Sequence, residues 1–332
     1  MESRQLVVVG AGISGTAAAI EAAKAGVQVT LIDENPVPTS LAGLNIPLFY
    51  GQRFTDAPHN EAEIVRTTRS ANEALTEAEE AGVDIQLGTC VWGAFRNSEN
   101  SRGLDGPQIG LSDYERSWML KFERLIVATG ARDLSIGFRG WELAGTMGAN
   151  GAYSLMDRYK ALSSERVVVL GSGDLGLNTA IMAMDSGVEI AAVVDVSPTV
   201  QGDVALAAAL QDRGVGVYTS HTISEAKGKD CEIQCVELVK IDDNAEPIAG
   251  TEKLISTDTV CLAIGLVPNV ELLSLLGCEL AFRSELGGHL PIHDEWMRTS
   301  VDNVFVAGDA AGFHDGMVLD REIARDQGRL AG

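Results

Sequence analysis

Two glycine-rich turns carry the clearest chemical signal in the sequence. The first has the spacing Gly10-x-Gly12-x-x-Gly15, and Asp33 lies 23 positions after Gly10. A turn of this kind lets the backbone approach a pyrophosphate, and the helix after it offers free N–H groups and a partial positive charge. A carboxylate placed like that of Asp33 accepts hydrogen bonds from the hydroxyls of an adenosine ribose. Strand, turn, helix, second strand and carboxylate together predict a dinucleotide site.

The second turn repeats the spacing as Gly171-x-Gly173-x-x-Gly176, and Asp195 lies 24 positions after Gly171. A carboxylate at that position would accept a free ribose 2′-hydroxyl and repel a 2′-phosphate. The segment after Asp195 contains no arginine until Arg213. NAD, or another adenine nucleotide such as ATP, is therefore the expected occupant, and NADPH is disfavoured.

The residues of the second turn leave its occupancy open. Asp174 lies inside the turn and adds a negative charge beside the expected phosphates. A duplicated fold can keep the glycines for close helix–strand packing alone. Binding of an adenine nucleotide and a structural remnant without ligand are therefore both retained as interpretations. The residues that would line an occupied site are Gly171, Gly173, Asp174, Leu175, Gly176 and Asp195.

Two further motifs indicate which dinucleotide the first turn holds. Residues 125–132 (LIVATGAR) and 304–312 (VFVAGDAAG) each read as a buried apolar strand that ends in a turn of small residues. Asp309 lies at the carboxyl end of the second strand, where ligands of open α/β sheets bind. Its carboxylate suits the ribityl hydroxyls of a flavin, and a helix starting near Met317 would direct its N-terminus at the flavin N1–O2 edge. The expected dinucleotide is FAD.

The predicted contacts to FAD come from segments far apart in the chain. They are Gly10, Gly12, Ile13, Ser14, Gly15, Asp33, Glu34, Val91, Ala128, Thr129, Gly130, Gly308, Asp309 and Met317.

One histidine is a candidate for chemistry. His314 follows the turn at 308–312 and is the histidine expected nearest to the flavin ring, with a solvated loop position as the alternative. Hydride transfer to a flavin requires position and electronics, without a metal or a nucleophile. No metal site is expected, because the other four histidines lack Cys/His ligand spacing. Trp141 and Trp296 are expected to be packing groups.

The elements that must position these residues predict an α/β fold. Residues 5–33 and 166–195 each read as strand, glycine turn, helix and strand, the unit of a parallel sheet. The second unit interrupts the first, which indicates two nested dinucleotide-binding domains. We expect a discontinuous FAD-binding domain at 1–138 and 262–332 and an inserted NAD- or adenine-nucleotide-binding domain at 139–261.

Composition and charge exclude several classes of partner. The 332 residues are 45% apolar and carry a formal net charge of −22, which repels nucleic acid and anionic membranes. A strand begins within a few residues of Met1, and the longest apolar stretch is interrupted at 268–271, so neither a signal peptide nor a membrane span is expected. The five cysteines include no Cys-x-x-Cys and are expected to be reduced, mostly buried thiols of a cytoplasmic protein.

The order of the motifs resembles a known flavoprotein group. The first glycine turn, Ala128-Thr129-Gly130, the inserted second turn, AIGLVPN (263–269) and GDAAG (308–312) occur in the order found in two-dinucleotide flavoproteins similar to thioredoxin reductase. Residues 140–156, 258–280 and 287–312 more narrowly resemble the FAD-binding subunit of heteromeric amine and imino-acid dehydrogenases. These include opine oxidases, hydrogen cyanide synthase, dye-linked proline dehydrogenases and the alpha subunit of heterotetrameric sarcosine oxidase.

This resemblance implies an FAD-dependent oxidoreductase that works in a complex. In those families another flavoprotein subunit oxidises the C–N bond, and many members carry an iron–sulfur-binding extension. The expected partners are thus a second flavoprotein subunit together with an iron–sulfur or small electron-transfer subunit. Here the extension is not expected, because the sequence ends at Gly332 directly after the last helix. The sequence also departs from the family at 39–45, where TSLAGLN replaces the expected Gly-Gly-Gln.

Three functions remain open from the sequence. The first is an electron-relaying, FAD-binding subunit of an amine or imino-acid dehydrogenase or oxidase. The second is a self-sufficient NADH-dependent flavin reductase that feeds an acceptor protein. The third is a nucleotide-binding scaffold subunit without chemistry. Disulfide reduction is not expected, because no cysteine pair lies beside the second turn.

Overall fold

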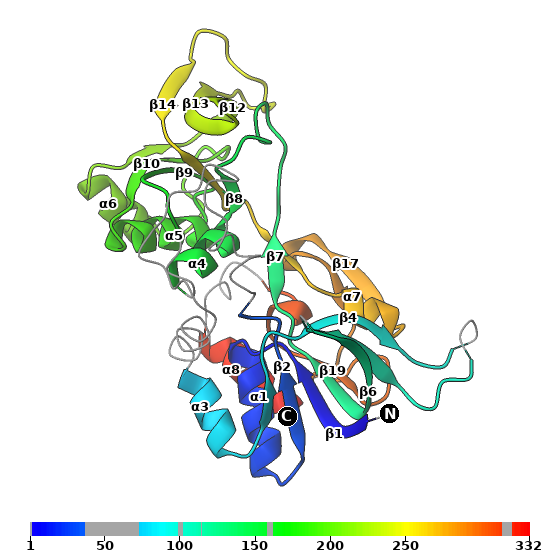
Figure 1. Cartoon of the computed structure of the whole chain (residues 1–332). Coiled ribbons are helices and arrows are strands. Elements are labelled where there is room, and N and C mark those ends of the chain that lie inside the picture. The colour runs from blue at the N-terminus through cyan, green and yellow to red at the C-terminus, as the bar shows by residue number, and fades with distance from the viewer. Residues whose placement is uncertain (1, 37–72, 99–101, 114, 158–161, 314–320) are drawn as a thin grey trace. The chain divides into compact units, whose positions relative to one another are not determined.

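A computed structural model describes residues 2–36, 73–98, 102–113, 115–157, 162–313 and 321–332. These residues form two compact units, each built on its own sheet (Figure 1). Unit 1 contains the described residues up to Arg132 and those from Val267 onward, and unit 2 contains Asp133–Leu266. The chain thus leaves unit 1, forms unit 2 and returns.

Unit 1 contains a parallel sheet extended by an antiparallel meander. Strands β3, β2, β1, β6 and β19 pair in that order, all parallel, and β5 and β4 continue from β6 as antiparallel strands. The bounds of these strands are β1 Glu2–Val9, β2 Val29–Ile32, β3 Asp84–Gln86, β4 Cys90–Phe95, β5 Gln108–Ser112, β6 Ser117–Val127 and β19 Val304–Val306. The helices of unit 1 are α1 Ile13–Lys24, α3 Glu73–Glu80, α7 Glu271–Leu275 and α8 Arg321–Ala331, with 3₁₀ turns η1 Ser284–Leu286 and η2 Gly308–Ala311.

Unit 2 repeats the parallel plan. Its five strands pair in the order β11, β10, β9, β15 and β8, all parallel, and a separate antiparallel sheet joins β12, β13 and β14. The strands are β8 Thr146–Gly148, β9 Arg166–Leu170, β10 Glu189–Val194, β11 Gly216–Tyr218, β12 His221–Lys229, β13 Glu232–Lys240, β14 Lys253–Ser256 and β15 Thr259–Leu262. The helices are α4 Ala149–Asp157, α5 Asp174–Asp185 and α6 Val204–Asp212. The α/β class with two dinucleotide-binding folds is confirmed.

Two short ladders complete the pairing. Strand β7 (Ala131–Asp133) pairs with β16 (Leu266–Pro268) where the chain passes between the units, and β17 (Leu280–Arg283) pairs with β18 (Gly288–Pro291) in unit 1.

The first strand of each unit is apolar because it is buried on both faces. Val7 and Val8 of β1 and Val168 and Val169 of β9 are fully buried, as expected for central strands of a parallel sheet. Each such valine stabilises the fold by about 1.5–3 kcal/mol relative to an exposed one. Each glycine turn follows directly at the carboxyl end of its central strand.

The C-terminal helix lies directly against the first helix (Figure 1). A Cβ on Gly328 of α8 would lie 2.1 Å from the carbonyl oxygen of Ser14, at the start of α1. Glycine is therefore needed where the two helix backbones meet. The contact holds the last described helix at the end of α1 that follows the glycine turn.

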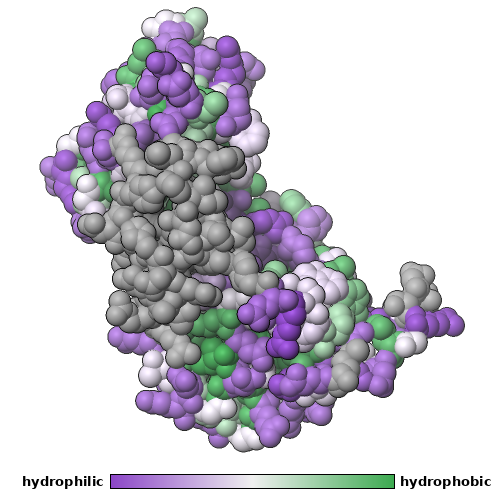
Figure 2. Space-filling model, in the orientation of Figure 1, coloured by the Kyte–Doolittle hydropathy of each residue, from purple (hydrophilic) through white to green (hydrophobic). Residues whose placement is uncertain are grey.

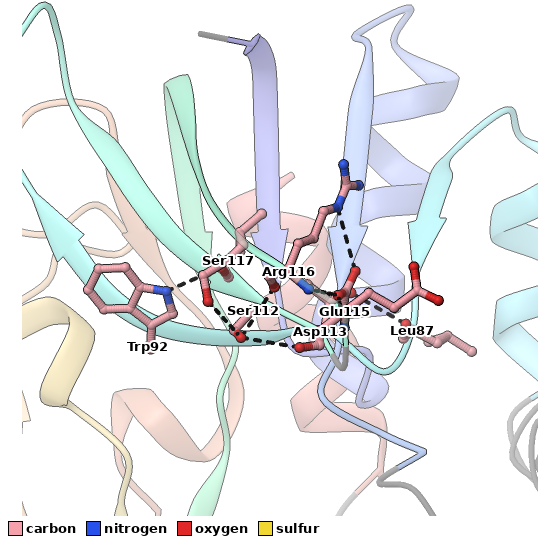
Figure 3. Close-up of polar contacts among 9 residues, drawn as sticks. Leu87, Trp92, Ser112, Asp113, Glu115, Arg116 and Ser117 are labelled. Atoms are coloured by element: carbon pink, nitrogen blue, oxygen red, sulfur yellow. Dashed lines mark hydrogen bonds and ion pairs between the residues drawn. The ribbon is translucent and has the colours of Figure 1, made fainter.

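The β5–β6 hairpin ends in a polar turn (Figure 3). The Asp113 carboxylate accepts hydrogen bonds from the backbone N–H groups of Glu115 and Arg116, which lowers the pKa of that carboxyl. Beside it, the indole N–H of Trp92 donates to the carbonyl of Leu111 (3.2 Å). These bonds fix the conformation of the turn.

Several local predictions from the sequence were wrong. The sequence predicts one strand over 83–95, but the structure has two, because Gly88 has a φ of +66° and its N–H donates to the carbonyl of Asn35, which interrupts the strand. Trp141 and Trp296 are 54% and 52% exposed, so they are not packing groups. The sequence also predicts a helix over 61–81, and α3 (Glu73–Glu80) confirms the part of it that lies within the described residues.

Hydrophilic residues cover most of the described surface on the face shown in Figure 2, in keeping with the net charge of −22. None of the described helices has both the length and the apolar character that crossing a membrane requires.

Candidate functional site

Three turns of unit 1 follow neighbouring parallel strands at the same edge of the sheet. The glycine turn follows β1, Ala128–Gly130 follows β6, and Gly308–Asp309 follows β19. The carboxyl ends of adjacent parallel strands point the same way, so these segments from distant parts of the sequence meet. The predicted FAD residues in these turns are therefore brought together.

The first glycine turn is packed too closely for side chains at two of its three glycines. A Cβ on Gly10, where φ is +103°, would lie 2.2 Å from the carbonyl oxygen of Ala128. A Cβ on Gly15 would lie 1.8 Å from the carbonyl oxygen of Gly10. These two glycines let strand β1, helix α1 and the Ala128 turn meet.

The middle glycine has a different role. A Cβ on Gly12 would have no atom of a described residue within 4 Å, and Gly12 has an extended backbone (φ −71°, ψ −173°) that any residue adopts. It is the N-cap of α1, and within the described part of the chain no side chain caps the first N–H groups of the helix. Open space beside uncapped N–H groups fits a pyrophosphate.

Asp33 is held beside the turn. Its Oδ2 accepts a hydrogen bond from the backbone N–H of Ala11 (2.6 Å), and its Oδ1 accepts from the N–H (2.7 Å) and the side-chain amide (2.9 Å) of Asn35. The half-buried carboxylate therefore keeps its orientation, and each oxygen can accept more than one hydrogen bond. Asn35 is a supporting residue that the sequence did not indicate.

The turn after β6 is tied to a segment 140 residues away in the sequence. The hydroxyl of Thr129 donates to the carbonyl of Asn269 (2.8 Å), and the Asn269 side chain donates to the carbonyl of Thr129 (3.0 Å). The backbone N–H of Asn269 also bonds the carbonyl of Gly130 (2.9 Å). The VPN sequence at 267–269 thus fixes the Ala128–Gly130 turn, a role that only the fold reveals.

Asp309 lies in the turn that follows β19. Gly308 has a φ of +69°, and a Cβ there would lie 2.3 Å from the hydroxyl oxygen of Ser14, so this turn touches the start of α1. The Asp309 side chain is exposed, yet the surrounding protein raises the pKa of its carboxyl by desolvation. No hydrogen bond from a described residue offsets that desolvation. A carboxylate in this state suits hydroxyl donors of a ligand.

The second glycine turn has nearly the same geometry as the first. Cβ atoms on Gly171 and Gly176 would lie 2.2 Å from the carbonyl oxygens of Ala263 and Gly171, respectively, whereas a Cβ on Gly173 would meet nothing within 4 Å. Gly173 is again an extended N-cap without a side-chain cap, here at the start of α5. Both middle glycines thus leave room for a Cβ, but at the second turn Gly202, from the loop after β10, lies against Gly173 and Asp174 at the start of α5.

The acidic residue of the second turn is more deeply buried than Asp33. Asp195 is only 7% exposed, and its Oδ2 accepts from both the N–H and the hydroxyl of Ser172 (2.6 Å each), while Oδ1 accepts from the N–H of Ser197 (2.8 Å). Ser172 takes the place that Ala11 has in the first turn. Each carboxylate thus accepts at least three hydrogen bonds from the protein, and the second is the more deeply buried of the two.

Asp174 bonds the chain itself. Its Oδ1 accepts from the backbone N–H of Asp203 (2.8 Å), and Asp203 in turn caps α6 by accepting from the N–H of Ala205 (2.7 Å). A Cβ on Gly202 would lie 2.6 Å from the N atom of Asp174. The carboxylate of Asp174 thus orders the loop after β10.

The remaining predicted residues have mixed outcomes. Ile13 lies exposed at the start of α1, Glu34 is exposed beside Asp33, Val91 lies half-buried on β4, and Leu175 lies half-buried on the first turn of α5. His314 and Met317 lie outside the described residues. In the described part of the chain, no three His, Cys, Asp or Glu side chains are grouped as metal ligands.

The cysteines differ in accessibility, and the expectation that most are buried was wrong. Cys90 and Cys231 are exposed, Cys235 is intermediate, and Cys261 and Cys278 are buried. Burial raises the pKa of the Cys261 thiol to about 12, and burial followed by the charge of Glu34 raises the pKa of Cys90. The two exposed cysteines lie at a strand end (Cys90) and in a hairpin turn (Cys231), positions that sequence periodicity predicts poorly.

We expect a thiol reagent to separate these cysteines. Only the thiolate reacts, so at pH 8 a pKa of about 12 leaves roughly one Cys261 in ten thousand reactive. Titration with a chromogenic disulfide should therefore show fast reaction at the exposed Cys231 and slower reaction at Cys90, whose pKa is also raised, with each phase lost in Cys231→Ser or Cys90→Ser. Reaction of Cys261 before unfolding in urea would contradict this assignment.

Comparison with known proteins gives a consistent result. The family model described as pyridine nucleotide-disulphide oxidoreductase matches residues 4–328. One of the opine oxidase subunits of Rhizobium meliloti is 26% identical over 99% of this chain and 62% of its own length. The HcnB subunit of hydrogen cyanide synthase from Pseudomonas aeruginosa is 27% identical over 98% of this chain and 69% of its own length. The chain thus spans about two thirds of these curated relatives.

A solved structure shows the same fold. Thioredoxin reductase of T. acidophilum superimposes with a TM-score of 0.69 at 21% identity, over 100% of this chain and 97% of that one. The fold and family resemblance expected from the order of the motifs are confirmed.

Proposed function

Because the chain belongs to the pyridine nucleotide-disulphide oxidoreductase family, we propose that it is the FAD-binding, electron-relaying subunit of a multi-subunit oxidoreductase acting on amines or imino acids. One observation supports FAD as the cofactor. The open space beside Gly12 and the Asp309 carboxylate both lie at the carboxyl ends of neighbouring parallel strands of unit 1. The support for a multi-subunit enzyme is that both cited relatives are named as subunits, of opine oxidase and of hydrogen cyanide synthase.

The residues of unit 1 would divide the binding of FAD among them. The N-terminus of α1 would hold the pyrophosphate at Gly12, Asp33 would accept the adenosine ribose hydroxyls, and Asp309 would accept the ribityl hydroxyls. When bound, FAD supplies reversible two-electron chemistry. The domain boundaries proposed from the sequence, 1–138 with 262–332 and 139–261, place this site in the discontinuous domain.

The electron balance defines the partners. A partner flavoprotein subunit would oxidise the C–N bond of the donor to an imine, releasing two electrons and two protons. The electrons would pass to this chain and then to an iron–sulfur or other small electron-transfer subunit. The chain would thus act on electrons and not on the amine itself.

Two measurements on the purified chain test this proposal. Nucleotides released by denaturation should contain about one FAD per chain, which chromatography and absorbance establish. The chain alone should not oxidise amines or imino acids with an artificial dye as acceptor, because the partner subunit would supply the site at which the C–N bond is oxidised. Rapid amine oxidation by the isolated chain would overturn the relay role.

A second candidate function is supported by the second turn. The space beside Gly173 matches that beside Gly12, which favours a nucleotide there, and the carboxylate of Asp195 favours NAD over NADP. In this alternative the protein is an NADH-dependent flavin reductase. ATP has no support in the names of the relatives and is not proposed.

NADH should separate the two functions. Mixed anaerobically with the FAD-loaded protein, NADH bleaches the flavin only if the second turn presents a nicotinamide productively. Gly173→Val should abolish any such bleaching without releasing FAD, because the added methyl groups enter the space beside α5 of unit 2, whereas FAD is proposed to bind in unit 1. Bleaching that survives Gly173→Val would contradict the second turn as the NADH site.

The same variant addresses the scaffold hypothesis. If the assembled complex keeps full activity with Gly173→Val, the second turn supports the structure alone. A loss of activity in an intact assembly would assign the turn a part in the reaction.

A further inference from the structure

A glutamine of the C-terminal helix reaches the turn that carries Asp309. The backbone N–H of Gly308 donates a hydrogen bond to Oε1 of Gln327 (3.0 Å), although the two residues lie 19 positions apart. Gly308 is buried, so its N–H would otherwise lack a partner away from water. The neutral amide satisfies this donor without adding a charge beside Asp309.

The helix that carries Gln327 is fixed by its next residue. Gly328 packs against α1 so closely that a Cβ would lie 2.1 Å from the carbonyl oxygen of Ser14 and 2.9 Å from the Cβ of Ala17. The hydroxyl oxygen of Ser14 would in turn lie 2.3 Å from a Cβ on Gly308. The start of α1, the Gly308 turn and the Gln327–Gly328 segment therefore meet at one point.

We propose that Gln327 is a positioning residue for the flavin site, because it holds the Gly308–Asp309 turn in register with the N-terminus of α1. The inference rests on the proposed binding of FAD in unit 1. Two groups at this point would contact FAD, the free N–H groups after Gly12 and the Asp309 carboxylate. They come from opposite ends of the chain, so their spacing depends on contacts such as this one.

Gln327 and Gly328 have different roles. Gly328 provides the close helix contact, whereas Gln327 adds a directed hydrogen bond to the turn. Changes at Gln327 should therefore leave the helix docked and act on FAD. A residue that only stabilises the fold would change the unfolding midpoint without changing the flavin.

Two variants separate the hydrogen bond from the charge. Gln327→Met keeps the length of the side chain but removes the acceptor that holds the Gly308 turn, and loss of this directed hydrogen bond should weaken FAD binding roughly five- to a hundredfold. Gln327→Glu keeps an acceptor but adds a negative charge near Asp309. It should bind FAD within a few-fold of the wild type and shift the flavin midpoint potential to a more negative value, since negative charge disfavours the anionic reduced ring.

The measurements are the FAD dissociation constant, by fluorescence titration of protein stripped of flavin, and the midpoint potential, by dye equilibration of the loaded protein. Asp326→Asn is the matched control, because Asp326 is the preceding residue of α8 and makes an exposed ion pair with Arg329. The control should leave both quantities unchanged. Urea unfolding of each variant verifies that α8 stays docked.

The outcomes are distinguishable. If the wild type binds FAD and both Gln327 variants match it in affinity and potential, the positioning role is overturned. If Gln327→Met fails to fold, Gln327→Glu still decides through its potential. If the wild type binds no FAD, the proposed function itself fails.

Discussion

Replacing Gly12 with valine is expected to give a folded protein that no longer retains FAD. Gly12 has an extended backbone that valine adopts readily, and a Cβ there would touch nothing within 4 Å, so the apo fold should tolerate the change. The valine methyl groups would instead fill the space through which a pyrophosphate reaches the N-terminus of α1. Overlap of this kind costs about 1–3 kcal/mol or more, which weakens binding roughly five- to a hundredfold or beyond.

Absorbance near 450 nm per chain, about where oxidised flavins absorb, measures the retained FAD. Gly173→Val is the matched control, since it adds the same side chain at the equivalent position of the second turn and should leave the protein yellow. Gly10→Ala is the opposite control: at a φ of +103° and 2.2 Å from the carbonyl of Ala128, even a methyl group should destabilise the fold. A fully yellow Gly12→Val protein would show that FAD does not bind at this turn.

Replacing Asp309 with asparagine should have opposite effects on FAD binding and on the stability of the apo protein. The variant loses a charged acceptor for the ribityl hydroxyls, and hydrogen bonds to charged groups contribute about 1.5–3 kcal/mol, so the FAD dissociation constant should rise roughly tenfold or more. In the apo protein the same carboxylate is desolvated and has no described partner, so asparagine removes an unfavourable charge.

The pH dependence follows from the raised pKa of Asp309. The folded state binds the Asp309 proton more tightly than the unfolded state does, so protonation of Asp309 stabilises the fold. This stabilisation is fully present below about pH 4, the ordinary pKa of an aspartate, and is lost as the pH rises through the raised pKa of the folded state. Apo Asp309→Asn should therefore be more stable than the wild type at pH 7, with the difference shrinking toward pH 4.

Urea unfolding of the apo proteins at both pH values measures this, and Asp302→Asn, an exposed aspartate just before β19, serves as the control. If Asp309→Asn destabilises the apo protein at pH 7, the carboxylate has a stabilising role within the fold. Unchanged FAD affinity in the same variant would remove Asp309 from the flavin site.

Patterns of neighbouring residues in the sequence were sufficient to predict the fold class and most of the first glycine turn. A continuous apolar strand, three glycines at fixed spacing and a carboxylate after the next strand lie within about 25 residues, and local backbone geometry decides their arrangement. The same reasoning predicted the second turn, whose glycine contacts match the first. Local pattern failed where a single glycine redirected the chain, as at Gly88, and where it assigned Trp141 and Trp296 to packing.

The pairing of distant segments was decided by the tertiary structure alone. Nothing in the composition or spacing of Asn269 or Gln327 indicates that they hold the Ala128–Gly130 and Gly308 turns, because each contact joins residues that meet only after the sheet and helices pack. The same holds for Asp195 and Asp174, whose identical charges were visible in the sequence but whose hydrogen bonds to Ser172 and Asp203 were not. The sequence by itself therefore determined which residue types could bind nucleotides, since that chemistry is local. Only the fold decided which of their hydrogen-bonding groups are already used within the protein and which remain for a ligand.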